Sequence, residues 1–519
     1  MQIIIYNFFI YPEWRDRMFN LIQKELEKQD NYSITENGAI GYKSTGSALV
    51  DINYKISSLR QSDEEEIIKL FDKAFEENRE YALKWLFFAR DIREGVGERR
   101  LFRICYKRLL KLDEDAFQKN LDNISEYGRW DDLISLIGIS KLTDEYIIKI
   151  IKKQLDEDLD NFNHNKAISL LAKWLPSENA SSTSTKIMAK RIIRLLGMTP
   201  RKYRLMLSDL RAYSNVVEVK MSSNEWNNID YEKVPSLANL KYKNAFMRHD
   251  ENRRLEYLKS VEMGESKINM HVATPVDIVS RYSRRYHGIR DYDETLELAW
   301  DNLKDIMVED TLVVADGSGS MTMHVSGKTM ALDVANALAV YTSEHNSGVY
   351  RNKYITFSNK PQFVEFKESD NLKTKLEIAL KHDEVANTNI EAVFDLILAI
   401  AVDKDIPQDE MIKNILIISD MEFDSAQRGW LGEDHTLTRP LFEVIAKRYE
   451  DAGYSLPKLI FWNVNSRTQT IPLTENELGV ALVSGFSQNV LKMVMSSKYD
   501  PYEVLVETIT GSRYARVKC

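Results

Sequence analysis

The sequence feature that most constrains the fold is an apolar run that ends in a short polar one. Residues 311–315 read TLVVA, and residues 316–320 read DGSGS. A short, continuous apolar run is typical of a strand that is buried on both faces of a parallel sheet. Such sheets bind their ligands at the carboxyl ends of the strands. Asp316, Ser318 and Ser320 therefore form a candidate site, and the competing interpretation is a polar turn after a strand.

Two later segments favour a site over a turn. Residues 414–419 form another apolar run, which ends at Asp420, and residues 384–390 place Thr388 just before an amphipathic stretch. From residue 308 onward, strand-like and helix-like segments alternate, which predicts a doubly wound α/β domain over 305–512. In that fold the three loops meet at one edge of the sheet. The predicted strands are 311–315, 352–358, 413–419, 458–463 and 479–484, and the predicted helices are 327–345, 389–402, 438–452 and 487–495.

The D-x-S-x-S pattern, followed by a threonine and an aspartate, resembles the metal-ion-dependent adhesion site of von Willebrand factor A (vWA) domains. Because carboxylate and hydroxyl oxygens are hard ligands, we expect Mg²⁺, with Mn²⁺ as an alternative, and an acidic group of a partner as the last ligand. The sequence departs from the family at Asn387, where glycine is usual, although asparagine tolerates left-handed conformations. The resemblance implies that the metal ligands are Asp316, Ser318, Ser320, Thr388 and Asp420.

Residues 13–295 have the pattern of a helical domain. Apolar residues recur at helical spacing, and helix-like segments follow one another in pairs. One pair for every roughly 30–45 residues is typical of a HEAT-like α-solenoid. Residues 216–270 contain Pro235 and polar turns, and we expect them to be irregular. The predicted fold class is therefore multidomain α and α/β, with a HEAT-like α-solenoid before the α/β domain. The pairs are 115–124 with 129–137, 143–155 with 165–175, and 184–196 with 200–212.

Two long motifs lie in the helical part. Residues 89–99 read ARDIREGVGER, and residues 127–133 read YGRWDDL. They resemble the A-R-D-x-R-x-G-x-G-E-R and Y-G-R-W-D-D-L motifs of TROVE domains. The order of a helical TROVE domain and then a vWA domain resembles the TROVE-plus-vWA family, to which the Ro ribonucleoprotein autoantigen belongs. Blocks that resemble a branch of this family from plants, fungi, bacteria and large DNA viruses are TENGA at 35–39, KWLPSEN at 173–179 and KNAFMRHD at 243–250.

This resemblance implies a monomeric ring of helical repeats that is closed by the vWA domain. It also implies RNA as a partner, bound as a single-stranded end or as a small structured RNA. It does not identify individual RNA contacts, because these lie outside the matched motifs. A virus-encoded origin is compatible with the branch.

Lys and Arg residues are unevenly distributed. The chain has a net charge of −9, but residues 161–290 contain 23 Lys or Arg and only 12 Asp or Glu. Basic side chains neutralise phosphates, and Tyr203 and Tyr213 could stack on bases. The alternative is a solvated helix face. The RNA-binding candidates are Lys186, Lys190, Arg191, Arg194, Arg201, Lys202, Arg204, Arg211, Arg281, Arg284 and Arg285.

The charged residues of the two motifs have two interpretations. They could form a patch near RNA or a catalytic group, or they could form ion pairs that fix the turns between helices. We favour the structural interpretation, since Trp130 and Leu133 indicate a packed helix start and Gly95 and Gly97 indicate an unusual turn. The residues concerned are Arg90, Asp91, Arg93, Glu98, Arg99, Arg100, Arg129, Asp131 and Asp132.

The sequence gives little support for catalysis. His324 is the only candidate base near Ser318 in the chain, and P-loop and dinucleotide-binding patterns are absent from the sequence. We therefore expect a non-enzymatic RNA-binding ring protein with a Mg²⁺ site. One alternative is a protein-interaction scaffold that uses the metal site. Another is a metal-dependent nuclease that uses Asp316 and Asp420.

Cysteine content and hydropathy bear on the compartment. Cys105 and Cys519 are the only cysteines, too few for a disulfide framework, which fits a reducing compartment. Residues 2–10 are apolar but short and lack a basic leader, so we expect no signal peptide. No run reaches the roughly 20 apolar residues of a membrane span. We expect an intracellular, cytoplasmic protein without membrane partners.

Overall fold

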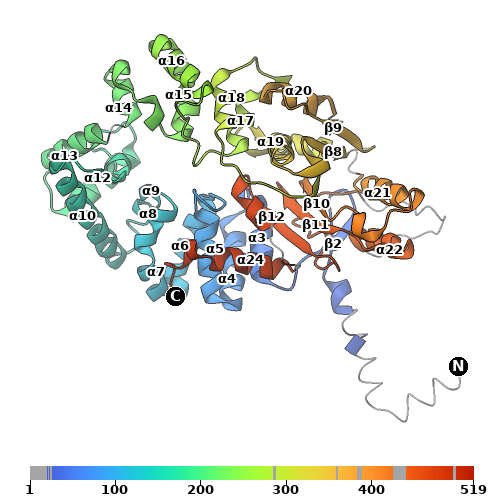
Figure 1. Ribbon diagram of the computed structural model, residues 1–519. Helices are drawn as coiled ribbons and strands as arrows, with labels where there is room; N and C mark the ends of the chain where they lie inside the picture. Colours follow the sequence, from blue (N-terminus) through green and yellow to red (C-terminus); the bar gives the residue numbers. More distant parts are fainter. Residues whose placement is uncertain are drawn as a thin grey trace.

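The computed structural model describes residues 20–21, 23, 26–214, 216–284, 288–357, 360–382, 389–424, 440–494, 498 and 500–519. It has a helical part and an α/β part with a six-stranded sheet, in line with the predicted α and α/β class. Figure 1 shows the helices curving away from the sheet and returning to it. Thr388 and Arg285 lie outside the described residues.

The helical part is built from amphipathic segments that pack mostly on helices nearby in the chain. In α4, for example, Ile67, Phe71, Ala74 and Phe75 share one buried face. The helices are α3 (Ala48–Tyr54), α4 (Glu64–Glu77), α5 (Arg79–Arg90), α6 (Arg100–Leu112), α7 (Glu114–Lys119), α8 (Ile124–Tyr127), α9 (Trp130–Ile134), α10 (Lys141–Asn163), α11 (Leu171–Trp174), α12 (Thr183–Leu196), α13 (Pro200–Tyr213), α14 (Val217–Ser222), α15 (Ser236–His249), α16 (Glu251–Glu262), α17 (Pro275–Tyr282) and α18 (Glu294–Asp301).

The prediction of an irregular segment over 216–270 is wrong, because α14, α15 and α16 occupy much of it. Pro235 does not interrupt a helix, since it stands at the N-cap of α15. The buried faces of α15 and α16 include the polar residues Ser236, Asn239 and Arg254, which obscured the apolar periodicity in the sequence.

The α/β part contains a sheet with the strand order β12-β11-β10-β5-β8-β9. The strands pair in parallel except for the antiparallel edge strand β9. The strand order reverses between β5 and β10, which run side by side from Thr311 opposite Asn414 to Ala315 opposite Ile418. The strands are β5 (Thr311–Asp316), β8 (Lys353–Phe357), β9 (Gln362–Glu365), β10 (Asn414–Ser419), β11 (Lys458–Asn463) and β12 (Val480–Ser484), and the helices are α19 (Ala331–Glu344), α20 (Leu372–His382), α21 (Glu391–Asp403), α22 (Leu441–Asp451), α23 (Leu491–Val494) and α24 (Pro501–Thr510).

Several elements of the α/β part differ from the sequence prediction. The helix expected from residue 327 begins only at Ala331, because β6 (His324–Ser326) and β7 (Thr329–Met330) form a hairpin before it. Strand β9 and helices α20 and α24 had not been predicted. Strand β9 is a short edge strand of four residues with only Val364 buried, so its sequence carries little apolar signal.

The α/β part contacts the helical part at two places. Helix α24 packs on α3 and α5, and α3 also packs on β12. At the other place, α17 packs on α19, and α18 packs on α20. Figure 1 shows the first helices beside α24 and the last helices beside α19 and α20. Buried apolar side chains of both parts belong to one continuous core.

An N-terminal hairpin also crosses between the parts. Strands β1 (Tyr32–Ile34) and β2 (Ile40–Tyr42) pair with each other, and Tyr42 exchanges backbone hydrogen bonds with Ile471 of the α/β part. Gly41 is needed here, since a Cβ atom would lie 2.5 Å from the Ile471 carbonyl oxygen. A second short hairpin, β3 (Ser283–Arg284) with β4 (Gly288–Ile289), precedes α18.

None of the helices in the described part of the chain combines the length and the apolar character that a bilayer crossing needs.

Candidate functional site

The candidate site lies at the carboxyl edge of the sheet, where β5 and β10 end next to each other. Asp316 is the last residue of β5, and Asp420 directly follows β10. Both carboxylates are buried, with exposed fractions of 1% and 0%. Ser318 and Ser320 lie in the loop after β5, with Ser318 buried and Ser320 partly exposed. The structure therefore brings together the four described residues of the predicted metal site, at the position where open α/β sheets bind ligands.

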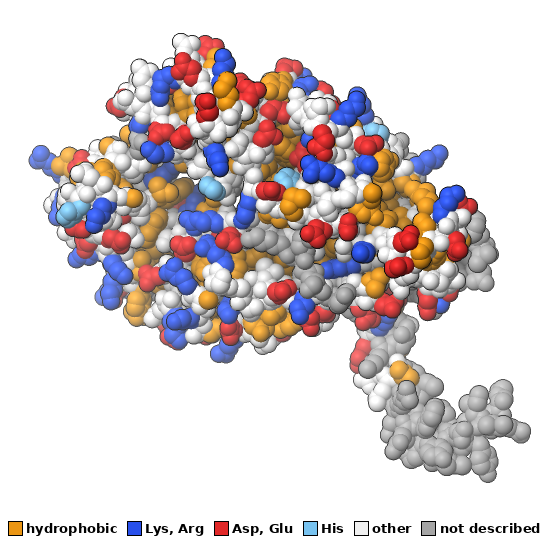
Figure 2. Space-filling view, viewed as in Figure 1, with side chains coloured by type: hydrophobic (Ala, Val, Ile, Leu, Met, Phe, Trp, Pro, Cys, Tyr) orange, Lys and Arg blue, Asp and Glu red, His pale blue; other side chains and the backbone are white. Residues whose placement is uncertain are grey.

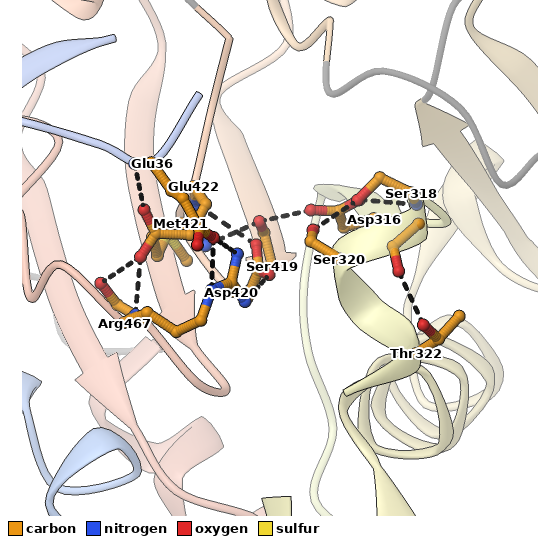
Figure 3. A network of polar contacts seen from close by, with 12 residues as sticks. Glu36, Asp316, Ser318, Ser320, Thr322, Ser419, Asp420, Met421, Glu422 and Arg467 are labelled. Carbon is orange, nitrogen blue, oxygen red and sulfur yellow. Dashed lines mark hydrogen bonds and ion pairs between the residues drawn. The ribbon is translucent and has the colours of Figure 1, made fainter. Parts of the chain in front are cut away.

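Hydrogen bonds fix these side chains (Figure 3). The Ser318 backbone amide donates to Asp316 Oδ1 at 2.9 Å, and the Ser419 hydroxyl donates to Asp316 Oδ2 at 2.6 Å. The hydroxyls of Ser318 and Ser320 are 3.0 Å apart, and Ser320 also forms a hydrogen bond with Asp420. The oxygen atoms of both loops thus belong to one hydrogen-bonded cluster.

The electrostatics of the cluster reflect two carboxylates in a buried place. Burial, and then the nearby Asp420, raise the pKa of Asp316 to about 7, although hydrogen bonds from Ser318 and Ser419 oppose the shift. Burial also raises the pKa of Asp420, against the opposing effect of Arg467. A cation beside both carboxylates would favour their ionised forms.

Arg467 is a residue of this site that the sequence did not predict. Its Nη1 donates to Asp420 Oδ2 at 2.8 Å, and its Nε donates to Glu36 Oε2 at 2.5 Å. Figure 3 shows Asp420 between Arg467 on one side and Asp316 with the two serines on the other. Asp420 is therefore shared between an arginine and the candidate metal ligands.

Glu422 is the second residue that sequence reasoning missed. Its carboxylate is fully buried and accepts hydrogen bonds from the backbone amides of Glu36, Arg467 and Thr468 at 2.8, 2.6 and 2.8 Å. The hydroxyls of Ser466 and Thr468 donate to it as well. Glu422 therefore ties the loop after β10 to the loop after β11 and to the N-terminal hairpin.

The loop after β10 also has a constrained backbone. Met421 has a φ of 62°, in the left-handed region that non-glycine residues seldom adopt. Its amide donates to the Ser419 hydroxyl at 2.9 Å, and its side chain is fully buried. Surrounding contacts hold this conformation, and such local strain is often found at binding sites.

The TENGA block at 35–39 is explained by contacts beside this site. The Thr35 hydroxyl donates to the Phe423 carbonyl at 2.7 Å, and the Asn37 side-chain amide donates to the Glu422 carbonyl at 2.6 Å. Glu36 contributes its amide to Glu422 and its carboxylate to Arg467. This N-terminal segment is thus part of the wall of the site.

The donor set fits a hard cation better than zinc. It offers carboxylate and hydroxyl oxygens, and its four described residues include neither sulfur nor imidazole. Thr388, the remaining expected ligand, is outside the described range. The residues that could hold a cation are therefore Asp316, Ser318, Ser320 and Asp420.

A nucleophilic role for Ser318 with His324 as its base finds no support in these contacts. Its hydroxyl bonds to Asp316 and Ser320, and no hydrogen bond links it to His324 in the part of the chain that the structure describes. The His324 side chain is exposed on β6. His324 is therefore not placed to activate the Ser318 hydroxyl.

The RNA-binding candidates fall into two groups. Arg211 donates to the carbonyls of Ala172 and Leu175, Arg191 pairs with Asp144, and Arg204 pairs with Glu178, so these arginines have structural partners. Five others are exposed on α12 and α13 and form no ion pair within the described ranges: Lys186, Lys190, Arg194, Arg201 and Lys202.

The remaining candidates and the tyrosines are less available. Arg281 is half-buried and donates to the Asp277 carbonyl, and Arg284 is exposed opposite Asp291 at 3.5 Å. Tyr203 is fully buried and donates to the Pro176 carbonyl at 2.9 Å. Stacking of Tyr203 on a base is therefore excluded, because its ring is not accessible.

The charged residues of the two helical motifs form an ion-pair network. Arg90, 2% exposed, donates to Asp132 Oδ2 at 2.9 and 2.7 Å, and Arg103 donates to the other oxygen at 2.7 Å. Asp91 binds Arg513 from the C-terminal segment at 2.9 and 3.1 Å. The motif residues thus join helices to each other and to the chain end.

The other motif residues have similar partners. Glu98 pairs with Arg60, Arg93 donates to the Glu126 carbonyl, and Arg129 holds Asp131 at 2.9 and 2.8 Å. Of the two interpretations of these motifs, the contacts favour the structural one.

The fold and the site define the class of the protein: a helical domain followed by an α/β domain with an Asp- and Ser-lined site at its strand-order reversal. Residues 35–149 and 144–311 match the family described as Domain of unknown function (DUF2828), and residues 310–512 match Domain of unknown function (DUF7788). A similar protein is "Uncharacterized protein L728" from Acanthamoeba polyphaga mimivirus. It is 32% identical over 520 residues, which cover 92% of this chain and 87% of that protein. The chain therefore belongs to the DUF2828 family, in its form with a DUF7788 domain.

Proposed function

We propose that this protein is a non-enzymatic RNA-binding protein whose α/β domain binds Mg²⁺ and captures an acidic group of a partner. The observation that carries the metal site is the meeting of Asp316, Ser318, Ser320 and Asp420 at the edge between β5 and β10. Two hydroxyls and two carboxylates are hard ligands that suit Mg²⁺ or Mn²⁺. Thr388 completes the expected set.

An acidic partner group is the natural last ligand of such a cation. Mg²⁺ usually keeps open positions for water or for an outside oxygen. With neutral hydroxyls among its ligands, the ion keeps positive charge that attracts a carboxylate or a phosphate. The partly exposed Ser320 marks the side from which such a group would approach.

Calorimetry of Mg²⁺ binding tests this site. Asp316→Ala should abolish binding, while Asp409→Ala, which removes an exposed carboxylate of the same domain, should leave it unchanged. Thermal unfolding of both variants verifies that the fold is retained. Unchanged Mg²⁺ affinity in Asp316→Ala, or in Asp420→Ala combined with Thr388→Ala, would contradict the proposed site.

The RNA-binding role is supported by the five exposed basic residues of α12 and α13. Each lacks an ion-pair partner among the described residues, so their charges are available to phosphates. Figure 2 shows Lys and Arg side chains gathered over the helices at the left of the view. The family resemblance supports the same role.

Charge reversal tests the RNA-binding face. Changing Lys190, Arg194 and Lys202 to Glu should weaken binding of a single-stranded RNA tail. Each lost phosphate contact should make the plot of log affinity against log salt concentration less steep by about 0.7. A control with the same change in net charge reverses three exposed lysines of the α/β part, Lys328, Lys367 and Lys413. If both triple variants bind RNA with the same affinity and slope, this face is not the RNA site.

A closed ring is part of the proposal. It is supported by the contacts of the α/β part with the first helices, through α24, and with the last helices, through α19 and α20. Small-angle scattering of the monomer should show a hollow particle; an extended particle would contradict closure.

A further inference from the structure

A pocket of about 420 Å³ lies between α6 and α4, away from the α12 and α13 face. Its wall is almost entirely basic, with Glu64 as the single acidic residue and with apolar surface from Ile68 and Ile104. In a chain of net charge −9, such a concentration of positive charge is unusual. The basic residues of the wall are Arg99, Arg100, Arg103, Lys107, Arg108 and Lys111.

Only some of these cations have carboxylate partners. Arg108 binds both oxygens of Asp72 at 2.8 and 2.7 Å, and Arg103 is held by Asp131 and Asp132. These contacts fix the shape of the wall. They use some, but not all, of the N–H donors of the two arginines.

The other cations are not neutralised. Lys107 and Lys111 are exposed and form no ion pair within the described ranges, and Arg100 donates only to the carbonyls of Leu59 and Arg60. Arg99 is 49% exposed and lies 3.6 Å from Asp131, which three arginines share. The pocket therefore keeps a surplus of positive charge.

Helix stability accounts for Lys111, which lies in the last turn of α6, where a helix C-terminus favours cations, but not for the other residues. Like charges four residues apart, as at Arg103, Lys107 and Lys111, weaken a helix, and the first turn of α6 carries Arg100 and no acidic residue, although a helix N-terminus favours acids. A solvated, stabilising face would alternate charges of both signs. An anionic ligand explains the surplus.

The spacing of the cations indicates an extended anion. Residues four apart on one face of a helix are separated by about 6 Å along its axis. Such a step is comparable to the separation of neighbouring phosphates along a nucleic acid strand. A single small anion would instead need the cations to converge on one point.

We infer that the α6 pocket is a second RNA site, which binds consecutive phosphates of a single strand through Lys107, Lys111 and Arg100. This inference rests on the proposed RNA-binding function and adds a site on the first helices of the chain. Ile68 and Ile104 line the same pocket and offer apolar surface to the stems of the lysines, while their charged ends stay in solvent.

The test compares two lysine pairs with the same spacing in the full-length protein. The double variant Lys107→Glu with Lys111→Glu should lower the affinity for a single-stranded RNA by at least about tenfold. It should also reduce the steepness of the plot of log affinity against log salt concentration by about 1.4, the value for two phosphate contacts. The control is Lys149→Glu with Lys153→Glu on α10, since both lysines are exposed and neither lines the pocket. Thermal unfolding verifies that each variant folds.

Each outcome is decisive. If the α6 pair and the α10 pair weaken binding equally, the pocket is not an RNA site. If the wild-type protein binds no RNA, the proposed function is wrong. If only the charge reversal on α12 and α13 lowers RNA affinity, the inference about the α6 pocket is wrong and the proposed function stands. Pyrophosphate and a glutamate-rich peptide serve as competitors. The pocket would be assigned to another ligand if pyrophosphate or the peptide binds saturably and more tightly than RNA, and if the α6 variant loses this binding.

Discussion

The affinity of the proposed cation site should depend on Arg467 and Glu36 in opposite directions. Arg467 bonds to Asp420 at 2.8 Å and competes with a cation for the same carboxylate. Glu36 draws the guanidinium the other way through its own hydrogen bond. Arg467→Gln should therefore strengthen Mg²⁺ binding, and Glu36→Gln should weaken it.

The structure allows rough magnitudes. Two unit charges about 4 Å apart interact by about 1 kcal/mol in water and by about 4 kcal/mol at a dielectric constant of about 20. Asp420 is fully buried and Arg467 is 23% exposed, so the interaction falls inside this range. We take an interaction energy from the lower part of this range, about 1.4 kcal/mol. Loss of that interaction in Arg467→Gln corresponds to a tenfold gain in Mg²⁺ affinity. Glu36 is 57% exposed and screened by water, so we expect a loss of only about twofold to threefold.

Calorimetric titration with Mg²⁺ alone measures both effects, at a pH above 7 so that Asp316 is ionised. The matched controls are Arg351→Gln and Glu368→Gln, which disrupt an exposed pair elsewhere in the α/β part. A purely structural role of the Glu36–Arg467 pair would weaken binding in both variants. Changes of the same sign, or no change, would refute this account of the site.

Three further outcomes are expected. Asp132→Ala leaves the buried Arg90 without its partner and should lower the free energy of unfolding by about 3–5 kcal/mol in urea titrations. Asp115→Ala, in the exposed pair with Lys119, is the control and should leave the free energy of unfolding nearly unchanged. Since the folded-state pKa of Asp316 is raised from 3.8 to about 7, stability of the metal-free protein should fall as pH rises through that interval, and Asp316→Asn should flatten this curve in pH-dependent melting. In calorimetry of the wild-type protein, Mg²⁺ affinity should fall as pH drops below 7. Labelled RNA incubated with the protein and Mg²⁺ or Mn²⁺ should stay intact on gels, and cleavage that disappears in Asp316→Ala would mean that the protein is a nuclease.

Local patterns were enough to predict the core of the α/β part. Strands β5 and β10 are continuous apolar runs, and the order of strands and helices places their carboxyl ends at one edge, so Asp316 and Asp420 could be paired from the sequence. Helices α15 and α16 escaped prediction because Asn239 and Arg254 lie on their buried faces, which breaks the apolar periodicity.

The missed part of the site depends on contacts between distant segments. Glu36 and Glu422 are 386 residues apart, and Arg467 lies 47 residues beyond Asp420. Glu422 and Arg467 belong to no quoted motif, and the TENGA block that contains Glu36 does not name its partners; a lone Glu or Arg in a loop is usually solvated. Only the packing of the N-terminal hairpin against the loop after β11 shows that they share one site.

The contacts between the two parts bear on how RNA could enter a closed ring. Asp91 is fully buried and is neutralised by Arg513 from the C-terminal segment, and the fully buried Glu422 takes a hydrogen bond from Glu36 of the N-terminal hairpin. Separating the parts would leave Asp91 without the arginine that offsets its loss of hydration and would remove one of the donors to Glu422, which is costly for buried charges. In the proposed ring these contacts would oppose opening, and we expect an RNA that occupies the hole to enter by a free end. Such a route of entry is compatible with the proposed binding of single-stranded ends.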